Sequence, residues 1–233
     1  MAISLTIYDG ADCIGGNKIL LEDSGTAILL DFGTNFKAEG MYFDEFLGPR
    51  STFGFSDLLA LGILPPLKSI YRPDLEYPGI WDKYYSHPLY RELEVQGILL
   101  SHAHFDHCGH ISYLREDIPV FTGLASALIC KALQDTGGGT RLQEICYTVR
   151  RELKDGLLKA TNYRKVPHEQ RCYCAFGAAD IPQGARTFWE RCDASRGLNV
   201  GLSGPAGVKP KSPGSLFASG RWTTPYPVRG HSV

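Results

Sequence analysis

The stretch Ser101-His102-Ala103-His104-Phe105-Asp106-His107 is the most informative part of this chain, and it follows the apolar residues 95–100. Those preceding residues have the pattern of a buried strand, so we expect the histidines to lie on a loop that leaves a strand end. Four of the seven histidines fall between residues 102 and 110. On such a loop His102 and His104 can turn toward one cation, while Asp106 and His107 reach a second. The spacing therefore predicts a metal-binding loop.

Imidazole nitrogens and a carboxylate at this spacing suit Zn²⁺, and Mn²⁺ or Fe²⁺ would also fit. Two such cations a few ångströms apart would share an activated hydroxide and polarise a scissile bond, which is hydrolytic chemistry with Asp106 as the candidate catalytic residue. The structural alternative is a surface loop of coincidentally clustered histidines, or a tag-like tract. A tract of that kind would be polar and low in complexity, whereas this cluster lies between the apolar residues 98–100 and Gly109. We therefore favour metal binding.

Asp31 is the candidate supporting carboxylate, because it follows the apolar run 27–30 at the end of an expected strand. A carboxylate in that position is costly unless it accepts hydrogen bonds, and we expect it to contact the loop 101–107. The alternative is a plain turn former. The nearby Gly15-Gly16-Asn17-Lys18 lacks the spacing of a phosphate-binding loop, so it is interpreted as a turn before a strand.

The composition is that of a folded globular protein, with 43% hydrophobic and 21% charged residues. The formal net charge of −1 provides no bulk attraction for a phosphate backbone. Binding of RNA would have to rest on a local basic patch, for which the candidates are Lys37, Arg50, Lys68 and Arg72. Residues 1–4 lack the features of a signal peptide and no membrane-spanning stretch is present, so we expect a cytoplasmic protein without a membrane partner. The seven cysteines are expected to be reduced thiols, and an oligomer is left open.

The pattern along the chain favours one α/β domain over residues 1–233. Residues 3–8, 17–21 and 26–31 predict a β-meander, and residues 120–122 a further strand. The Pro-, Gly- and aromatic-rich residues 36–96 are interpreted as an insertion that shapes a site and lies outside the core, with a short helix at 56–61 capped by Ser56. Further helices are expected at 109–115, 126–134 and 143–153, and residues 195–220 are expected to form a flexible connection.

The motif His102-x-His104-x-Asp106-His107, preceded by an apolar strand and a serine, resembles the signature loop of the metallo-β-lactamase superfamily. The resemblance extends from residue 3 to about residue 125 and implies an αββα sandwich. It also implies that His102 and His104 bind the first of two zinc ions, that Asp106 and His107 bind the second, and that Asp31 supports the loop. The segments 14–18 and 29–33 are most similar to the ribonuclease J-like metallo-hydrolases.

The chain departs from this family beyond the loop. The family's complete fold needs a third histidine motif, a bridging aspartate and a last histidine, and no convincing bridging aspartate or last histidine is present here. Residues 226–233 resemble the approach to the third motif, which makes His231 a candidate metal ligand. We therefore expect an incomplete sandwich, the N-terminal half of the fold plus an insertion.

The resemblance implies a metal-dependent hydrolase that cleaves phosphodiester bonds in RNA with a hydroxide activated by two metal ions. A small-molecule hydrolase of the lactonase or thioesterase type would use the same loop. A non-catalytic fragment that keeps one partly built metal site is the alternative from a different class. A basic patch in the segment 36–96 would favour the nuclease over the small-molecule enzyme.

Overall fold

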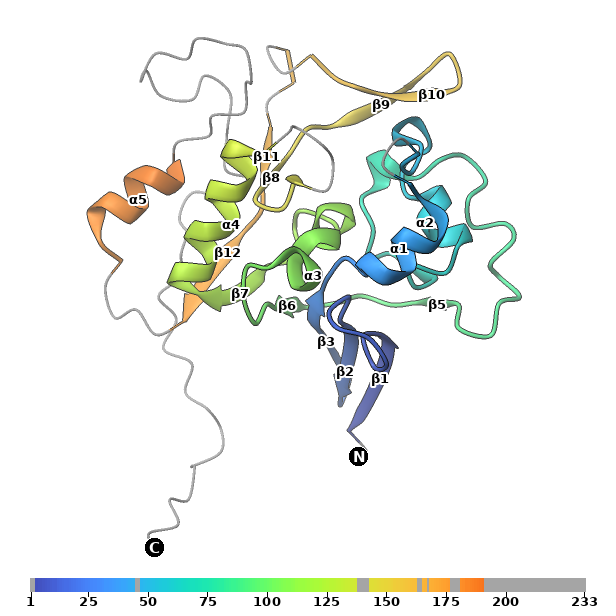
Figure 1. Cartoon of the computed structure of the whole chain (residues 1–233), viewed down its shortest axis with the longest axis horizontal. Coiled ribbons are helices and arrows are strands. Elements are labelled where there is room, and N and C mark those ends of the chain that lie inside the picture. The colour runs from blue at the N-terminus through green and yellow to red at the C-terminus, as the bar shows by residue number, and fades with distance from the viewer. Residues whose placement is uncertain are drawn as a thin grey trace, which may run out of the picture.

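A six-stranded mixed sheet organises the residues that the computed structural model describes, which are 3–44, 47–137, 143–162, 165–166, 168–176 and 181–190. Three strands pair antiparallel as β1-β2-β3, and the sheet continues in parallel from β3 through β6, β7 and β12. Helices accompany this sheet (Figure 1), so the expected α/β class is confirmed. The six strands are β1 (Ser4–Asp9), β2 (Lys18–Asp23), β3 (Thr26–Phe32), β6 (Gly97–Leu99), β7 (Val120–Gly123) and β12 (Tyr173–Phe176).

The first three strands form the predicted β-meander. β2 and β3 are joined by a tight turn in which Ser24 and Gly25 have φ values of 52° and 88°. Two consecutive positive φ angles are typical of the hairpin turns whose twist matches that of the flanking strands. The connection that the meander requires between the expected strands 17–21 and 26–31 is therefore a tight turn.

The segment 36–96 contains more regular structure than the sequence indicated. Helix α1 (Phe36–Tyr42) was not predicted, and its N-cap is Asn35, whose side chain accepts a hydrogen bond from the amide of Ala38 at 2.9 Å. Helix α2 (Ser56–Ala60) lies where a helix was expected, but the prediction that Ser56 caps it is wrong. Phe55 occupies the N-cap position, and the buried hydroxyl of Ser56 has no hydrogen-bond partner. The remaining short elements are η1 (Ser51–Phe53), β4 (Leu67–Lys68), η2 (Pro73–Leu75) and β5 (Arg91–Glu92).

The expectation that this segment lies outside the core is also wrong. Its aromatic side chains Phe55 and Tyr71 are buried and stack with ring centroids 4.6 Å apart. Leu64 and Leu67 are fully buried in the same cluster as the sheet residues. Aromatic and apolar side chains separated by prolines give no helical or strand period, yet large aromatic side chains contribute strongly to a core once they are buried.

The second half of the described chain confirms two predicted elements and corrects one. The helix α4 (Leu124–Thr136) lies where a helix was expected and packs against β7 and β12 (Figure 1). Residues 109–115 begin with the short 3-10 helix η3 (Gly109–Tyr113). No helix forms at 143–153, where the structure has β8 (Tyr147–Thr148) and β9 (Arg151–Lys154). The other elements are α3 (Phe105–Cys108), β10 (Leu157–Ala160), β11 (Glu169–Gln170) and α5 (Gln183–Glu190).

The error at 143–153 has a local cause. β9 and β10 form a hairpin around Asp155 and Gly156, whose φ values are 52° and 74°. The Asp-Gly pair is a strong hairpin signal because both residues tolerate positive φ. This turn favours strand pairing over the helical spacing of the preceding apolar residues. The expected flexible connection at 195–220 lies outside the described residues.

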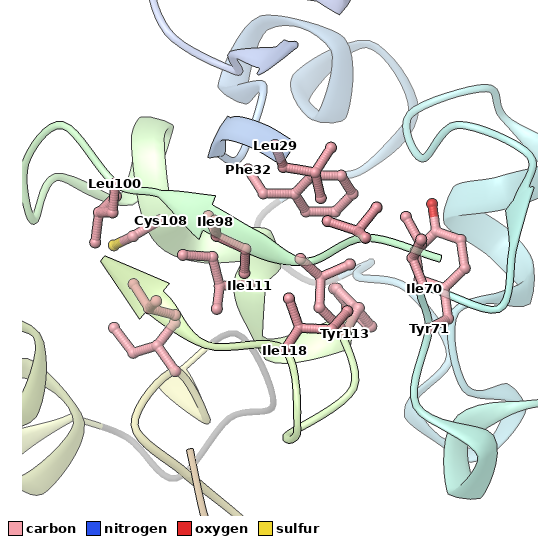
Figure 2. Packing of buried hydrophobic residues seen from close by; sticks show 14 of the residues in the cluster. Leu29, Phe32, Ile70, Tyr71, Ile98, Leu100, Cys108, Ile111, Tyr113 and Ile118 are labelled. Atoms are coloured by element: carbon pink, nitrogen blue, oxygen red, sulfur yellow. The ribbon is translucent and has the colours of Figure 1, made fainter. Parts of the chain in front are cut away.

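The two faces of the sheet differ in how they are covered. One row of paired positions carries Leu20, Leu29, Ile98, Val120 and Tyr173, all fully buried. Figure 2 shows side chains from this row packed with residues of η3 such as Ile111. This buried face lies against the helical elements and forms the core below the loop 101–107.

The opposite face is apolar but incompletely covered. The paired positions there are Ile7, Ile19, Leu30, Leu99, Phe121 and Cys174, and each of them is half-buried or exposed. Ile7 is 50% exposed and its neighbour Leu5 is 56% exposed. Among the described residues no helix has both the length and the apolar character needed to span a bilayer.

Candidate metal centre

The His-rich loop leaves the sheet at the carboxyl ends of two parallel strands. Leu30 of β3 pairs with Leu99 of β6, so the residues that follow each strand lie side by side at one edge. The chain then runs through Ser101 and His102 into α3, which carries Asp106 and His107. The loop therefore begins at the end of β6, directly beside the end of β3.

Asp31 is aimed at this loop by a β-bulge. Ile19 pairs with Leu30 and Lys18 pairs with Phe32, which leaves Asp31 as the extra residue of β3. Its φ is 56°, a left-handed conformation that Asp tolerates better than most residues. Bulges of this kind redirect a side chain next to a functional site.

The carboxylate of Asp31 holds the loop through three hydrogen bonds, and the side chain is buried. Its Oδ1 accepts from the amide of Ser101 at 2.7 Å, and its Oδ2 accepts from the Ser101 hydroxyl at 2.9 Å. Nδ1 of His107 lies 2.8 Å from the same Oδ2. Asp31 thus lies where a supporting carboxylate was expected.

These hydrogen bonds determine which ring nitrogens carry protons. The Ser101 hydroxyl has one proton and donates it to Asp31, so it accepts from Nδ1 of His102, which is 2.9 Å away. A carboxylate can only accept, so Nδ1 of His107 carries the proton in that contact. In the neutral imidazole the second nitrogen then has a free lone pair. Nε2 of His102 and Nε2 of His107 are therefore available as metal ligands.

Each of these nitrogens lies near a second potential ligand atom. The distance between the two atoms is close to that between two ligands of one metal ion. Nε2 of His102 is 3.2 Å from Nδ1 of His104. Two nitrogens bound tetrahedrally at 2.0–2.1 Å would be about 3.3 Å apart. Nε2 of His107 is 3.6 Å from Oδ2 of Asp106, a second pair of potential ligand atoms. The ring centroids of His102 and His107 are 4.0 Å apart, so the two pairs are adjacent.

The arrangement supplies pairs of ligands and not a closed site. Over the described ranges, no group of three or more His, Cys, Asp or Glu side chains is arranged to hold a single ion. Four-coordinate zinc would need further ligands for each pair. His231, the other candidate ligand, lies outside the described residues.

The turn at residues 15–17 also supports the loop, a role that the sequence analysis missed. The amide of Gly16 donates to the carbonyl oxygen of Asp106 at 2.8 Å. A Cβ on Gly15 would lie 2.4 Å from Oδ2 of Asp106, and one on Gly33 would lie 1.7 Å from the Asp106 carbonyl oxygen. Only glycine permits such close approach of two backbones. The signal in the sequence was the pair of glycines, which also suits an ordinary turn.

A buried polar cluster lies behind this turn. Lys18 is fully buried and donates to Asp9 at 3.1 Å and to the carbonyl oxygen of Gly16 at 3.3 Å. The side-chain NH₂ group of Asn35 donates to the other carboxylate oxygen of Asp9 at 2.7 Å. Burial lowers the pKa of Lys18, although Asp9 opposes this. The cluster connects the start of α1 to the turn that contacts Asp106.

His110 is a buried structural partner of α1. The structure places it in η3, fully buried, with Nε2 2.8 Å from Glu39 and Nδ1 without a partner. Burial lowers its pKa to about 4, and the positive charge of Lys18 acts in the same direction. The ring is therefore neutral near pH 7.

The basic patch considered for RNA binding does not form as expected. Arg72 is fully buried and pairs with Asp74 at 2.8 Å, Glu116 at 3.2 Å and Glu144 at 2.8 Å. Arg50 pairs with Asp57 at 2.6 Å and Lys68 with Glu92 at 3.4 Å, while Lys37 is exposed. A buried, charge-compensated arginine cannot contact a phosphate backbone.

Comparisons with known proteins add little to this geometry. No family model matches the chain, and no curated protein matches it. A solved structure of a protein of unknown function from Enterococcus faecalis V583 is 27% identical, with a TM-score of 0.44. The match covers 58% of this chain and 29% of that one, so the chain spans less than a third of that protein's length. A similarity at this TM-score carries no argument about fold or function.

Proposed function

We propose that this protein is a metal-dependent hydrolase whose metal centre is built on the loop 101–107. The observation that carries the proposal is the set of hydrogen bonds between the Asp31 carboxylate and this loop. Its contacts with Ser101 and His107 leave Nε2 of both His102 and His107 with free lone pairs beside a second donor. Each of these nitrogens lies 3.2 or 3.6 Å from a second potential ligand atom, so one cation placed between the two atoms of a pair would be bound by both.

The donor set fits Zn²⁺, with Mn²⁺ or Fe²⁺ as the alternatives. His102 and His104 would hold one ion, and Asp106 and His107 a second. Bound cations would supply a nucleophile from water and polarise the scissile bond. The chain's own residues orient the ligands: Asp31 fixes two imidazole rings, and Gly16 fixes the backbone of Asp106.

The same resemblance supports an αββα sandwich as the complete fold. The apolar outer face of the sheet supports this part of the proposal. A row from Ile7 of β1 to Phe121 of β7 is apolar across five strands and incompletely covered. A continuous apolar face of this kind is typical of a sheet that packs against another layer.

Two substrate classes remain for this site. Phosphodiester bonds in RNA, as in ribonuclease J-like enzymes, are the first candidate because of the motif resemblance. Small lactones or thioesters are the second, and the structure offers a specific observation for them. Arg72 is buried, and both Arg50 and Lys68 are ion-paired, so three of the four basic residues considered for RNA binding in this segment are already engaged with carboxylates.

The test is a metal-reconstitution assay on the 233-residue chain. Metal-free protein is titrated with Zn²⁺ or Mn²⁺ and assayed on single-stranded RNA, bis(4-nitrophenyl) phosphate, a lactone and a thioester. We expect hydrolysis of one class to appear with metal and to disappear in Asp106→Asn, while Asp155→Asn stays active. Hydrolysis that is independent of metal, or unaffected by Asp106→Asn, would contradict the proposal. Metal binding without hydrolysis of any substrate would indicate the non-catalytic alternative.

A further inference from the structure

Two buried arginines donate hydrogen bonds to five successive carbonyl oxygens, those of residues 111–115, which follow the loop 101–107 in sequence. Arg171 donates to the carbonyl oxygens of residues 111, 114 and 115 at 3.0, 2.9 and 2.5 Å. Arg72 donates to the carbonyl oxygens of residues 112 and 113, from its guanidinium at 3.3 Å and from its backbone amide at 2.9 Å. Both side chains are buried.

These carbonyls belong to the far end of the segment that carries the metal ligands. α3 holds Asp106 and His107 and is followed directly in sequence by η3, which ends at Tyr113. The last carbonyls of a helix have no partner within the helix, and a cation at that end is favourable. The arginines therefore fix the end of a helical segment whose beginning carries the metal ligands.

Arg171 is itself held firmly. Its guanidinium also donates to the carbonyl oxygen of Ile145 at 3.2 Å, and its backbone amide donates to the carbonyl oxygen of Cys146 at 2.8 Å. It lies between β11 and β12, so it connects the parallel sheet to η3. A planar guanidinium presents five donors in a fixed fork, which a lysine ammonium cannot reproduce.

We propose that Arg171 is a positioning residue of the metal centre. By holding the carbonyls of η3 it fixes the rotation of α3, and with it the separation of the donor atoms of Asp106 and His107. The inference rests on the proposed metal site and extends it to a residue remote in sequence. Arg72 is a less suitable test residue, because its removal would also leave the carboxylates of Asp74, Glu116 and Glu144 without their cation.

The experiment compares Arg171→Met and Arg171→Lys with the wild-type chain. The matched control is Arg91→Met, because Arg91 pairs with Glu22 at 2.6 Å on β2, away from the loop. Zinc affinity is measured by competition with a chromophoric chelator, and Co²⁺ is substituted to record the visible absorption of the ligand field. Circular dichroism establishes conditions in which each variant is folded.

We expect Arg171→Met to raise the Kd for zinc at least tenfold and to alter the Co²⁺ spectrum, with partial rescue by Arg171→Lys. Arg91→Met should keep the wild-type values. A folded Arg171→Met with wild-type Kd and spectrum would overturn the inference. If wild type itself binds no metal, the proposed function fails first, and that result is distinct from a failure of Arg171 alone.

A measurement on the wild type covers the case in which the variants do not fold. Coupling between two sites is reciprocal, so zinc binding at the loop should stabilise the contacts of Arg171. Hydrogen–deuterium exchange of the Arg171 amide should slow when zinc is added, while amides of β1 and β2 keep their rates. Unchanged exchange at Arg171 in zinc-bound protein would overturn the inference.

Discussion

Replacing Asp31 by Asn is the sharpest test of how the loop is prepared for metal. Asn tolerates a φ of 56° as Asp does, so the bulge should persist. The carbonyl oxygen of the new side chain would keep accepting from the Ser101 amide, so its NH₂ group would take the place of Oδ2. That NH₂ group would then face the protonated Nδ1 of His107 at 2.8 Å, donor against donor. His107 can avoid this clash only by moving its proton to Nε2, which removes the lone pair from the metal position.

The same substitution also reverses the direction of the hydrogen bond between Ser101 and His102. The Ser101 hydroxyl, now accepting from the introduced amide over the 2.9 Å contact, would donate to Nδ1 of His102. The proton of His102 would then lie on Nε2, which faces His104. Loss of one partner that orients a metal ligand typically lowers affinity 10–100-fold, or about 1.4–2.7 kcal/mol. Because Asp31→Asn affects two ligands, we expect the upper end of that range.

The assay is a zinc titration against a chromophoric chelator, with Asp155→Asn as the control. Asp155 also has a positive φ, 52°, but lies in an exposed turn of the β9–β10 hairpin. Nitrogen-15 NMR of the histidine rings reports the protonated nitrogen directly. A wild-type zinc affinity in Asp31→Asn, with unchanged ring tautomers, would refute the reasoning.

Three further outcomes follow from the structure. Gly33→Ala should weaken zinc binding and destabilise the fold, since its Cβ would lie 1.7 Å from the Asp106 carbonyl oxygen; an affinity and melting temperature equal to wild type would contradict the close approach. Arg72→Met should lower the free energy of unfolding in urea by about 3–5 kcal/mol, because buried carboxylates lose their cation; a change below about 1 kcal/mol would count against this. His110 has a folded pKa of about 4 against 6.5 unfolded, so the unfolded state binds more protons between those values and stability falls by about 3 kcal/mol as pH drops through that window. His110→Gln should flatten that slope in urea titrations at several pH values, whereas the exposed His87→Gln should leave it intact.

The fold and the site were predictable from sequence to different degrees. The meander, the strand before the histidines and α4 follow from local period and turn residues, which is why they could be expected from residues 3–32, 95–100 and 124–136 alone. The buried role of the segment 36–96 could not, because Phe55 and Tyr71 stack across a distance in sequence without any period. The helix expected at 143–153 failed because the Asp155-Gly156 turn imposes a hairpin.

The candidate site shows the same division. His102, His104, Asp106 and His107 are close in sequence, so their spacing indicated their proximity. Two contacts could not be read from spacing: that of Gly16 with Asp106, and those of Arg171 with η3. Gly16 is about 90 positions from Asp106 in sequence, and Arg171 is about 60 positions from the residues of η3. The burial of Arg72 was likewise invisible, because an arginine in a loop is usually exposed.

The zinc content of the purified chain reports directly whether the loop 101–107 binds metal. The wild-type chain, His102→Ala, the double variant His102→Ala/His107→Ala and the exposed control His87→Ala are incubated with Zn²⁺ and desalted. Plasma emission spectrometry then gives the zinc content per chain. We predict that wild type and His87→Ala retain equal zinc, that His102→Ala retains less, and that the double variant retains almost none. Equal zinc in all four proteins, or none in the wild type, would contradict the account.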